Sequence, residues 1–134
     1  MRFADTSFWF ALAERGEPRH AAAKALLQGA RRTQIVVSNH VVGETWTLLR
    51  RRSGHAAGLG FLERLSRLVN VEVVHIDEAT ENDAWEWLRR HDEREYSFVD
   101  ATSFGLMRAR GIREAFAFDG DFSAAGFIEV RPPD

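Results

Sequence analysis

The 134-residue sequence contains no cysteine. This absence excludes a disulfide framework, a thiolate zinc site and a cysteine nucleophile. Long hydrophobic runs are also missing, and the first apolar residues of the chain already reach a charge at Asp5. We therefore expect neither a signal peptide nor a membrane span, which makes the cytoplasm the expected location.

Lysine is scarce, because Lys24 is the only one in the chain. Apart from it, positive side-chain charge is supplied by arginine, and about half of the arginines occur in short groups, of which 50–52 is the longest. A formal charge of −2 argues against binding a polyanion through bulk positive charge. The planar guanidinium nevertheless suits phosphate, so Arg50, Arg51 and Arg52 are candidates to contact a phosphate backbone. The alternative is that they are solvated helix-end residues.

The apolar residues, 45% of the chain, follow a simple alternating pattern. Short β-branched or aromatic runs predict strands at 3–4, 35–37, 71–76, 115–118 and 127–130, with helical spacing in between. One of these helices carries Leu59, Leu62, Leu65 and Leu68. Strands alternating with helices predict one α/β domain over residues 1–134, with a parallel sheet covered on both faces.

Two aspartates directly follow predicted strands. Asp5 comes after Phe3 and Ala4, and Asp119 comes after Phe118. Sites in open parallel sheets form at the carboxyl ends of strands, which makes both residues candidates. Each also has a purely structural interpretation, since Asp5 can cap the next helix and Asp119-Gly120 is a common turn pair.

Two further acids lie on apolar helix faces. Glu44 shares a face with Val41 and Leu48, where a carboxylate needs a partner. Asp100 shares a face with Phe104, although Ser97 to Asp100 also fits a variant capping box.

Taken together, Asp5, Glu44, Asp100 and Asp119 are expected to meet at one edge of the sheet. Carboxylates crowded in this way repel one another unless they are protonated or a cation neutralises them. Hard oxygen ligands without histidine or cysteine favour Mg²⁺ or Mn²⁺, which can activate water and neutralise charge on a phosphodiester. The sequence therefore predicts metal-dependent phosphodiester hydrolysis.

The order of the acidic motifs resembles a known family. The segments that carry the resemblance are Phe3-Ala4-Asp5-Thr6-Ser7, Ser38-Asn39-His40-Val41-Val42-Gly43-Glu44, Tyr96-Ser97-Phe98-Val99-Asp100-Ala101 and Ala117-Phe118-Asp119-Gly120-Asp121-Phe122. In sequence and spacing, and over nearly the whole chain, they are similar to PIN-domain ribonucleases of the VapC toxin type.

This resemblance implies a three-layer α/β/α sandwich, an RNA substrate, a Mg²⁺ or Mn²⁺ cofactor, a cognate antitoxin that covers the site, and a homodimer. It assigns metal binding to Asp5, Asp100 and Asp119, adds Glu44 to the catalytic acids, and leaves open whether Asp121 is also a ligand. Thr6 is implied as a supporting hydroxyl. One departure is Ala117, where the family often has a hydroxyl residue.

Other interpretations stay open at this stage. A structure-specific DNA nuclease is the nearest, because metal-assisted hydrolysis does not require a 2′-hydroxyl. An acidic-pocket phosphoacceptor domain is a non-nuclease alternative, but it normally needs a lysine at a late strand end, and Lys24 is in the wrong place. Among the aromatic residues, Trp9 near Asp5 is the first candidate to stack on RNA bases.

Overall fold

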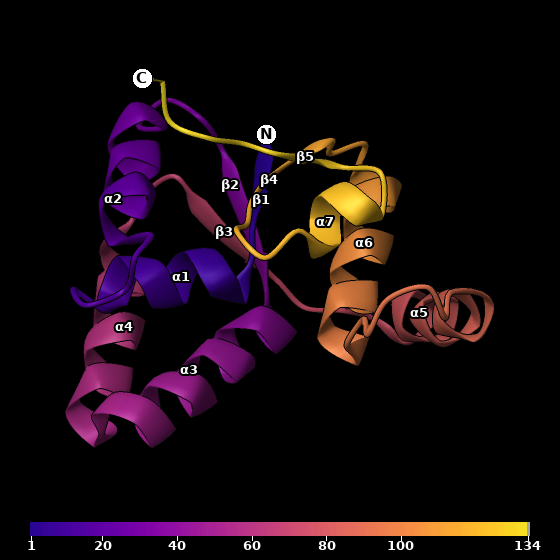
Figure 1. Ribbon diagram of the computed structural model, residues 1–134, viewed down its shortest axis with the longest axis horizontal. Helices are drawn as coiled ribbons and strands as arrows, with labels where there is room; N and C mark the ends of the chain where they lie inside the picture. The colour runs from indigo at the N-terminus through magenta and orange to yellow at the C-terminus, as the bar shows by residue number, and fades with distance from the viewer. Residues whose placement is uncertain (134) are drawn as a thin grey trace.

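Five short strands form one parallel sheet at the centre of the computed structural model, which describes residues 1–133 (Figure 1). Their order is β3-β2-β1-β4-β5. The strands are β1 (Arg2–Ala4), β2 (Ile35–Ser38), β3 (Val71–Val74), β4 (Glu114–Phe116) and β5 (Ile128–Glu129). The prediction of a parallel sheet is confirmed by this pairing.

In the described part of the chain, seven helices cover the two faces of the sheet. The strand order moves one way from β1 to β3 and then returns to β4 and β5, and right-handed crossovers place the two sets of connections on opposite faces. One layer contains α1 (Thr6–Ala13), α2 (His20–Gly29), α3 (Asn39–Ser53) and α4 (His55–Arg67), and the other contains α5 (Glu78–Arg90), α6 (Phe98–Arg110) and α7 (Asp121–Ala124) (Figure 1). The predicted α/β/α architecture is confirmed.

Three of the strands, β3, β4 and β5, are shorter than the apolar runs that predicted them. In the runs 71–76, 115–118 and 127–130, some residues lie in the connection before or after the strand and not in the strand itself. At β4 the pairing stops at Phe116, so Ala117 and Phe118 already belong to the loop that leads to Asp119. Apolar residues continue past the strand because this loop is itself partly buried.

The apolar face of α4 differs from the predicted one. Gly58, Phe61 and Leu65 form its buried face, whereas Leu59 and Leu62 are 49% and 39% exposed. A Cβ atom on Gly58 would lie 2.7 Å from the Trp46 ring of α3, so the missing side chain is what lets the two helices approach. The spacing of the leucines alone could not show this, because glycine makes no contribution to a hydrophobic pattern.

Within residues 1–133, no helix combines the length and the apolar character needed to cross a lipid bilayer.

Candidate active site

The site lies where the strand order reverses. From β1 the chain goes to β2 on one side, while β4 pairs with the other side of β1, with Ala4 opposite Phe116. The backbone N–H of Asp5 donates to the carbonyl oxygen of Phe116 at 3.0 Å, which ties the end of β1 to the end of β4. Ligands of doubly wound sheets bind in the crevice at such a reversal point. The fold therefore brings Asp5 and the Asp119 segment to one place.

Asp5 is buried, with 2% of its surface exposed, and it is the N-cap of α1. Its Oδ2 atom accepts hydrogen bonds from the backbone N–H of Ser7 at 3.2 Å and from the Ser7 hydroxyl at 2.8 Å. Its Oδ1 atom is buried and has no hydrogen-bond partner among residues 1–133. One oxygen of Asp5 therefore caps the helix, and the other has no partner in the described residues and faces no competing hydrogen bond.

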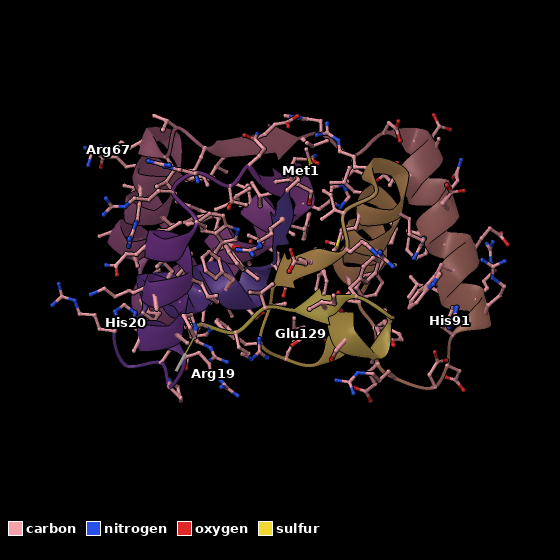
Figure 2. The ribbon with its side chains drawn as sticks, turned by 90° about the horizontal axis from the view of Figure 1, so that it is seen from above. Met1, Arg19, His20, Arg67, His91 and Glu129 are labelled. Carbon is pink, nitrogen blue, oxygen red and sulfur yellow. The ribbon has the colours of Figure 1, made fainter. Side chains whose placement is uncertain are left out.

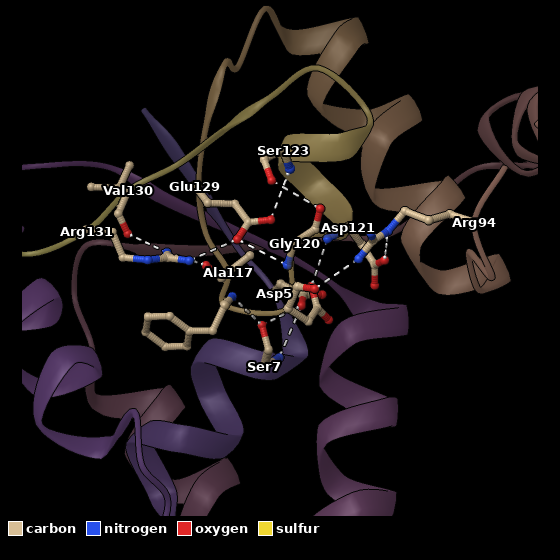
Figure 3. A network of polar contacts seen from close by, with 12 residues as sticks. Asp5, Ser7, Arg94, Ala117, Gly120, Asp121, Ser123, Glu129, Val130 and Arg131 are labelled. Atoms are coloured by element: carbon tan, nitrogen blue, oxygen red, sulfur yellow. Dashed lines mark hydrogen bonds and ion pairs between the residues drawn. The ribbon is translucent and has the colours of Figure 1, made fainter.

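Ser7 is a supporting residue that sequence reasoning missed. Besides donating to Asp5, its hydroxyl accepts a hydrogen bond from the backbone N–H of Phe118 at 3.0 Å (Figure 3). It therefore joins the segments that carry Asp5 and Asp119. The resemblance had assigned support to Thr6, whose buried hydroxyl has no hydrogen-bond partner in the described part of the chain. The available signal was position, because a residue two places after an N-cap aspartate lies within reach of its carboxylate.

Asp100 is held at the start of α6 by the predicted capping box. Its backbone N–H donates to the Ser97 hydroxyl at 3.0 Å, and its Oδ2 atom accepts from the backbone N–H of Ser97 at 3.0 Å. The residue is 8% exposed. The capping box fixes the direction of the carboxylate, and the same side chain lines the cavity that Asp5 lines.

Asp119 and Asp121 belong to a turn that an arginine ties to the α5–α6 connection. The Asp119 carboxylate accepts from the backbone N–H of Asp121 at 3.3 Å. Arg94, in the α5–α6 connection, donates from Nε to Asp121 at 2.8 Å and from a terminal nitrogen to the carbonyl oxygen of Asp119 at 3.1 Å (Figure 3). Sequence reasoning gave Arg94 no role, because its contact spans two connections that only the tertiary structure brings together.

Glu129 and Arg131 hold the same turn from the C-terminal side. Glu129 accepts hydrogen bonds from the backbone N–H groups of Gly120 at 3.3 Å and Ser123 at 3.0 Å. Arg131 pairs with Glu129 at 3.1 Å and donates to the carbonyl oxygen of Ala117 at 2.7 Å (Figure 3). Arg131 therefore holds the backbone at Ala117, the position where the family often has a hydroxyl residue. The sequence signal for Glu129 was a charge inside a short apolar strand.

All the predicted acids line one cavity of about 630 Å³. Asp5, Asp100 and Asp119 enter it from the strand ends and from α6, and Asp121 enters it from the turn. Glu44 enters from α3, where it is half-buried. The buried face of α3 is Val41, Thr45 and Leu49, so Glu44 lies beside the apolar face of that helix and not within it.

Burial, with the charge of neighbouring carboxylates, raises the pKa of three of these acids. Burial, followed by the charges of Asp119 and Asp100, raises the pKa of Asp5 to about 8. Burial also raises the pKa of Asp100 to about 6, with the charges of Asp121 and Asp119 adding to the shift. Partial burial and the nearby Asp121 carboxylate raise the pKa of Asp119. The cavity is therefore a site where negative charge is costly without a cation.

The donor set fits a hard divalent cation, but it is not preassembled. Within residues 1–133, no three acidic or histidine side chains are arranged to hold a metal ion as they stand. Asp100 gives an oxygen to its capping box, Asp119 to a turn N–H and Asp121 to Arg94. This corrects the expectation of tightly converging carboxylates. The unpartnered Asp5 oxygen and the raised pKa values of Asp5, Asp100 and Asp119 still make carboxylate ligation of Mg²⁺ or Mn²⁺ chemically suitable.

Residues 2–128 match the family model described as the PIN domain. This chain belongs to the PIN-domain family. The match confirms the family predicted from the acidic motifs and, with it, a nuclease. PIN-domain nucleases generally depend on a divalent metal ion.

Two curated relatives and one solved structure are similar to this PIN domain. The relatives are the 23S rRNA-specific endonuclease VapC20 from two Mycobacterium tuberculosis strains, CDC 1551 and H37Rv. Each is 59% identical over 133 residues, which are 98% of this chain and 99% of the relative. A crystal structure of Mycobacterium tuberculosis VapC20, described as a sarcin-ricin loop cleaving toxin, superimposes with a TM-score of 0.90. It is 56% identical and covers 98% of this chain and 100% of its own.

Of the residues predicted to contact RNA, Trp9 is buried and the three arginines at 50–52 are exposed. Trp9 is 1% exposed, its indole N–H donates to the Ala4 carbonyl oxygen at 3.2 Å, and Phe8 packs against its ring. The expectation that Trp9 stacks on RNA bases is therefore wrong, because core residues already cover its ring. Arg50, Arg51 and Arg52 are exposed at the end of α3, and only Arg52 lines the acidic cavity.

The raised pKa values have a consequence for stability. In a chelating buffer, we expect the thermal midpoint of this PIN domain to fall as the pH rises from about 5 to about 8. The pKa of Asp5 in the folded protein, about 8, lies above its ordinary value, so the unfolded chain releases this proton first. The stabilisation is complete below the unfolded pKa and is lost as the pH passes through the folded value.

Thermal unfolding at several pH values with a chelator, repeated with Mn²⁺, tests this expectation. Added Mn²⁺ should raise the midpoint most at the alkaline end, where the carboxylates are ionised. A midpoint that is flat or rises with pH in the chelating buffer would show that the acids do not destabilise the folded state.

Proposed function

We propose that this chain is a metal-dependent endoribonuclease that cleaves 23S rRNA within the sarcin-ricin loop. The observation that carries the proposal is the acidic cavity at the β1–β4 reversal point, in a chain 59% identical over 98% of its length to a 23S rRNA-specific endonuclease. The solved relative is described as a toxin that cleaves the sarcin-ricin loop. An identity this high over whole chains supports the same substrate for both proteins.

In this proposal, Asp5, Asp100 and Asp119 hold Mg²⁺ or Mn²⁺, and Asp121 joins them if it leaves Arg94. An ion held there would lower the pKa of a water molecule and would neutralise charge on the scissile phosphate. The chain's own residues position these groups. Ser7 and the Ser97 capping box orient Asp5 and Asp100, and Thr6 closes the wall beside them.

Glu44 has a different role because it enters the cavity from α3, away from the strand ends. We assign it to the attacking water, whose proton its carboxylate can accept through a hydrogen bond. Arg94, Glu129 and Arg131 act indirectly, since they fix the turn that carries Asp119. Hydrolysis then requires only in-line attack on a phosphodiester held between these groups.

We also propose the biological setting that the toxin relative suggests. The chain acts in the cytoplasm as the toxin of a toxin-antitoxin pair, forms a homodimer, and is inhibited by an antitoxin protein that covers the acidic cavity. The carboxylates of that cavity would favour an inhibitor segment that carries a basic side chain, because a cation relieves their mutual repulsion.

Cleavage of purified ribosomes tests the function directly. With Mg²⁺ or Mn²⁺ we expect a single cut in 23S rRNA, mapped by primer extension to the sarcin-ricin loop, and no cut in the presence of a chelator. A short RNA hairpin of the same loop and its DNA counterpart provide the matched substrates. Cleavage of the DNA at an equal rate would favour a DNA nuclease, and cleavage of neither nucleic acid would refute the proposal.

A further inference from the structure

Two arginines line the same cavity as the acids. Arg19 lies in the α1–α2 connection and Arg52 near the end of α3. In the view of Figure 2, Arg19 lies at the start of α2, on the edge of the molecule where Glu129 is also found. The cavity therefore has cationic residues from the helical layer of α1–α4 as well as carboxylates from the strand ends.

Each of these arginines lies over an aromatic ring of the cavity wall. The Arg19 guanidinium carbon is 5.9 Å from the centre of the Phe118 ring, and that of Arg52 is 5.5 Å from the centre of the Phe10 ring. Phe118 directly precedes Asp119, and Phe10 is part of the helix capped by Asp5. An aromatic face attracts a guanidinium and leaves its N–H edges free to donate. The rings thus hold both cations beside the acidic end of the cavity.

These two arginines also differ from Arg94 and Arg131, which hold the acidic turn, in having no carboxylate partner among the described residues. Arg94 pairs with Asp121, and Arg131 pairs with Glu129. In the described residues, by contrast, neither Arg19 nor Arg52 has an acidic oxygen within 4.0 Å.

Two glutamates line the cavity or the hollow next to it, and neither forms an ion pair with Arg19 or Arg52. Glu17 lines the same cavity without forming an ion pair with either arginine. Glu14, which lines a hollow next to Arg52, accepts a hydrogen bond from the Ser53 hydroxyl at 2.5 Å. Both guanidinium groups therefore keep their donors available to an anion that enters the cavity.

We infer that Arg19 and Arg52 form a phosphate-binding subsite for the RNA strand beside the phosphodiester that is cut. The inference rests on the proposed function, since it assigns the contacts of the same substrate. RNA brings a negative charge with every nucleotide, and the carboxylates of the cavity repel it. The two guanidinium groups offset this repulsion by binding the phosphates on either side of the cut. They also orient the RNA strand across the acids.

The three arginines at 50–52 lie in different places relative to the acidic cavity. Arg52 lines the acidic cavity, Arg51 lines a neighbouring hollow beside Glu44, and Arg50 lines neither. Helical spacing explains the division, because successive residues point about 100° apart around α3. Only one arginine of the triplet can therefore join Arg19 at the cavity.

The test measures RNA binding without cleavage. In an Asp5→Asn background, Arg19→Gln and Arg52→Gln are each expected to raise the Kd for the sarcin-ricin hairpin about tenfold. The slope of log K against log salt should fall by roughly 0.7 to 0.9 for each lost phosphate contact. In the otherwise wild-type enzyme the same changes should raise KM more than they lower kcat, and Arg52→Lys should restore only part of the affinity.

Arg31→Gln is the matched control, because it removes the same charge from the exposed α2–β2 connection. An equal loss of affinity in Arg31→Gln would overturn the subsite and indicate a net-charge effect. Unchanged Kd and salt slope in both cavity variants would also overturn it, while wild-type cleavage of the hairpin would leave the proposed function intact. If the wild-type protein cleaves no RNA, the proposed function is refuted. If the Asp5→Asn protein also fails to bind the hairpin, the phosphate-binding subsite is refuted as well.

Discussion

Replacing Asp5 with asparagine is expected to abolish RNA cleavage and, at alkaline pH in a chelating buffer, to raise thermal stability. We expect a loss of at least about 10³-fold in kcat/KM, because the variant removes a carboxylate that serves the metal site. Asparagine has nearly the same shape, and its carbonyl oxygen can still accept the two hydrogen bonds from Ser7. The fold should therefore persist.

The gain in stability follows from the raised pKa of Asp5, about 8, whose largest cause is burial. A neutral amide removes both the desolvation of a buried carboxylate and its repulsion by Asp119 and Asp100. Such opposite effects on activity and stability are typical of residues that serve a site. A purely structural N-cap would instead lose little activity.

Hairpin cleavage and thermal unfolding of the same preparations measure both effects. Asp92→Asn is the matched control, because Asp92 is exposed and lies outside the cavity wall. It should change neither quantity. Full cleavage activity in Asp5→Asn would remove this residue from the catalytic machinery, and a lower midpoint at alkaline pH would contradict the electrostatic account.

Truncation of Phe104 to alanine is expected to lower the free energy of unfolding by about 3–5 kcal/mol. Phe104 is fully buried and lies one turn after Asp100 on α6. Its ring contacts Trp87 at 5.1 Å and Phe122 at 4.9 Å between centroids, and it stacks on Phe127 at 5.5 Å. It thus packs the helix that carries Asp100 against the segment that follows Asp119.

Because of this position, the truncation should affect the site as well as the core. We expect Phe104→Ala to lower the affinity for Mn²⁺ under conditions where the protein is still folded, since a loosened α6 misplaces Asp100. Phe104→Leu should retain most of the stability and the affinity. Phe61→Ala, which removes a buried ring from α4, is the comparison for a loss of stability away from the site.

Denaturant titration and calorimetric Mn²⁺ binding distinguish these effects. If Phe104→Ala and Phe61→Ala lower the metal affinity equally, Phe104 has no special connection to Asp100. If Phe104→Ala costs less than about 1 kcal/mol, the aromatic cluster is not part of the cooperative core.

The elements of this fold could be predicted where a local rule acts alone. Alternation of apolar runs placed all five strands, and the capping box from Ser97 to Asp100 was recognised because it depends on residues three apart. The errors lie where contact with another element decides the result. Leu59 and Leu62 have helical spacing, yet Gly58 is what allows Trp46 to pack against α4.

The same distinction applies to the residues of the candidate site, some of which could be predicted from the sequence and some of which could not. Asp5, Glu44, Asp100 and Asp119 could be selected because a carboxylate directly after a strand, or on or beside an apolar helix face, conflicts with its surroundings. Trp9 was misassigned because closeness in sequence to Asp5 does not say which way a ring points, and this ring points into the core. Ser7, Arg94, Glu129 and Arg131 were missed because each connects segments that lie apart in the chain or joins backbone groups that have no sequence signal.

The sequence by itself determined the strand and helix elements, the acidic residues and the PIN-domain family, because periodicity and motif spacing are properties of the chain alone. Only the tertiary structure decided that β4 returns to lie beside β1, which brings Asp5 and Asp119 to one cavity. It also decided which arginines are neutralised by carboxylates and which two stay free over aromatic rings. The physical reason is that burial and charge pairing depend on distances in space, and a linear sequence does not contain them.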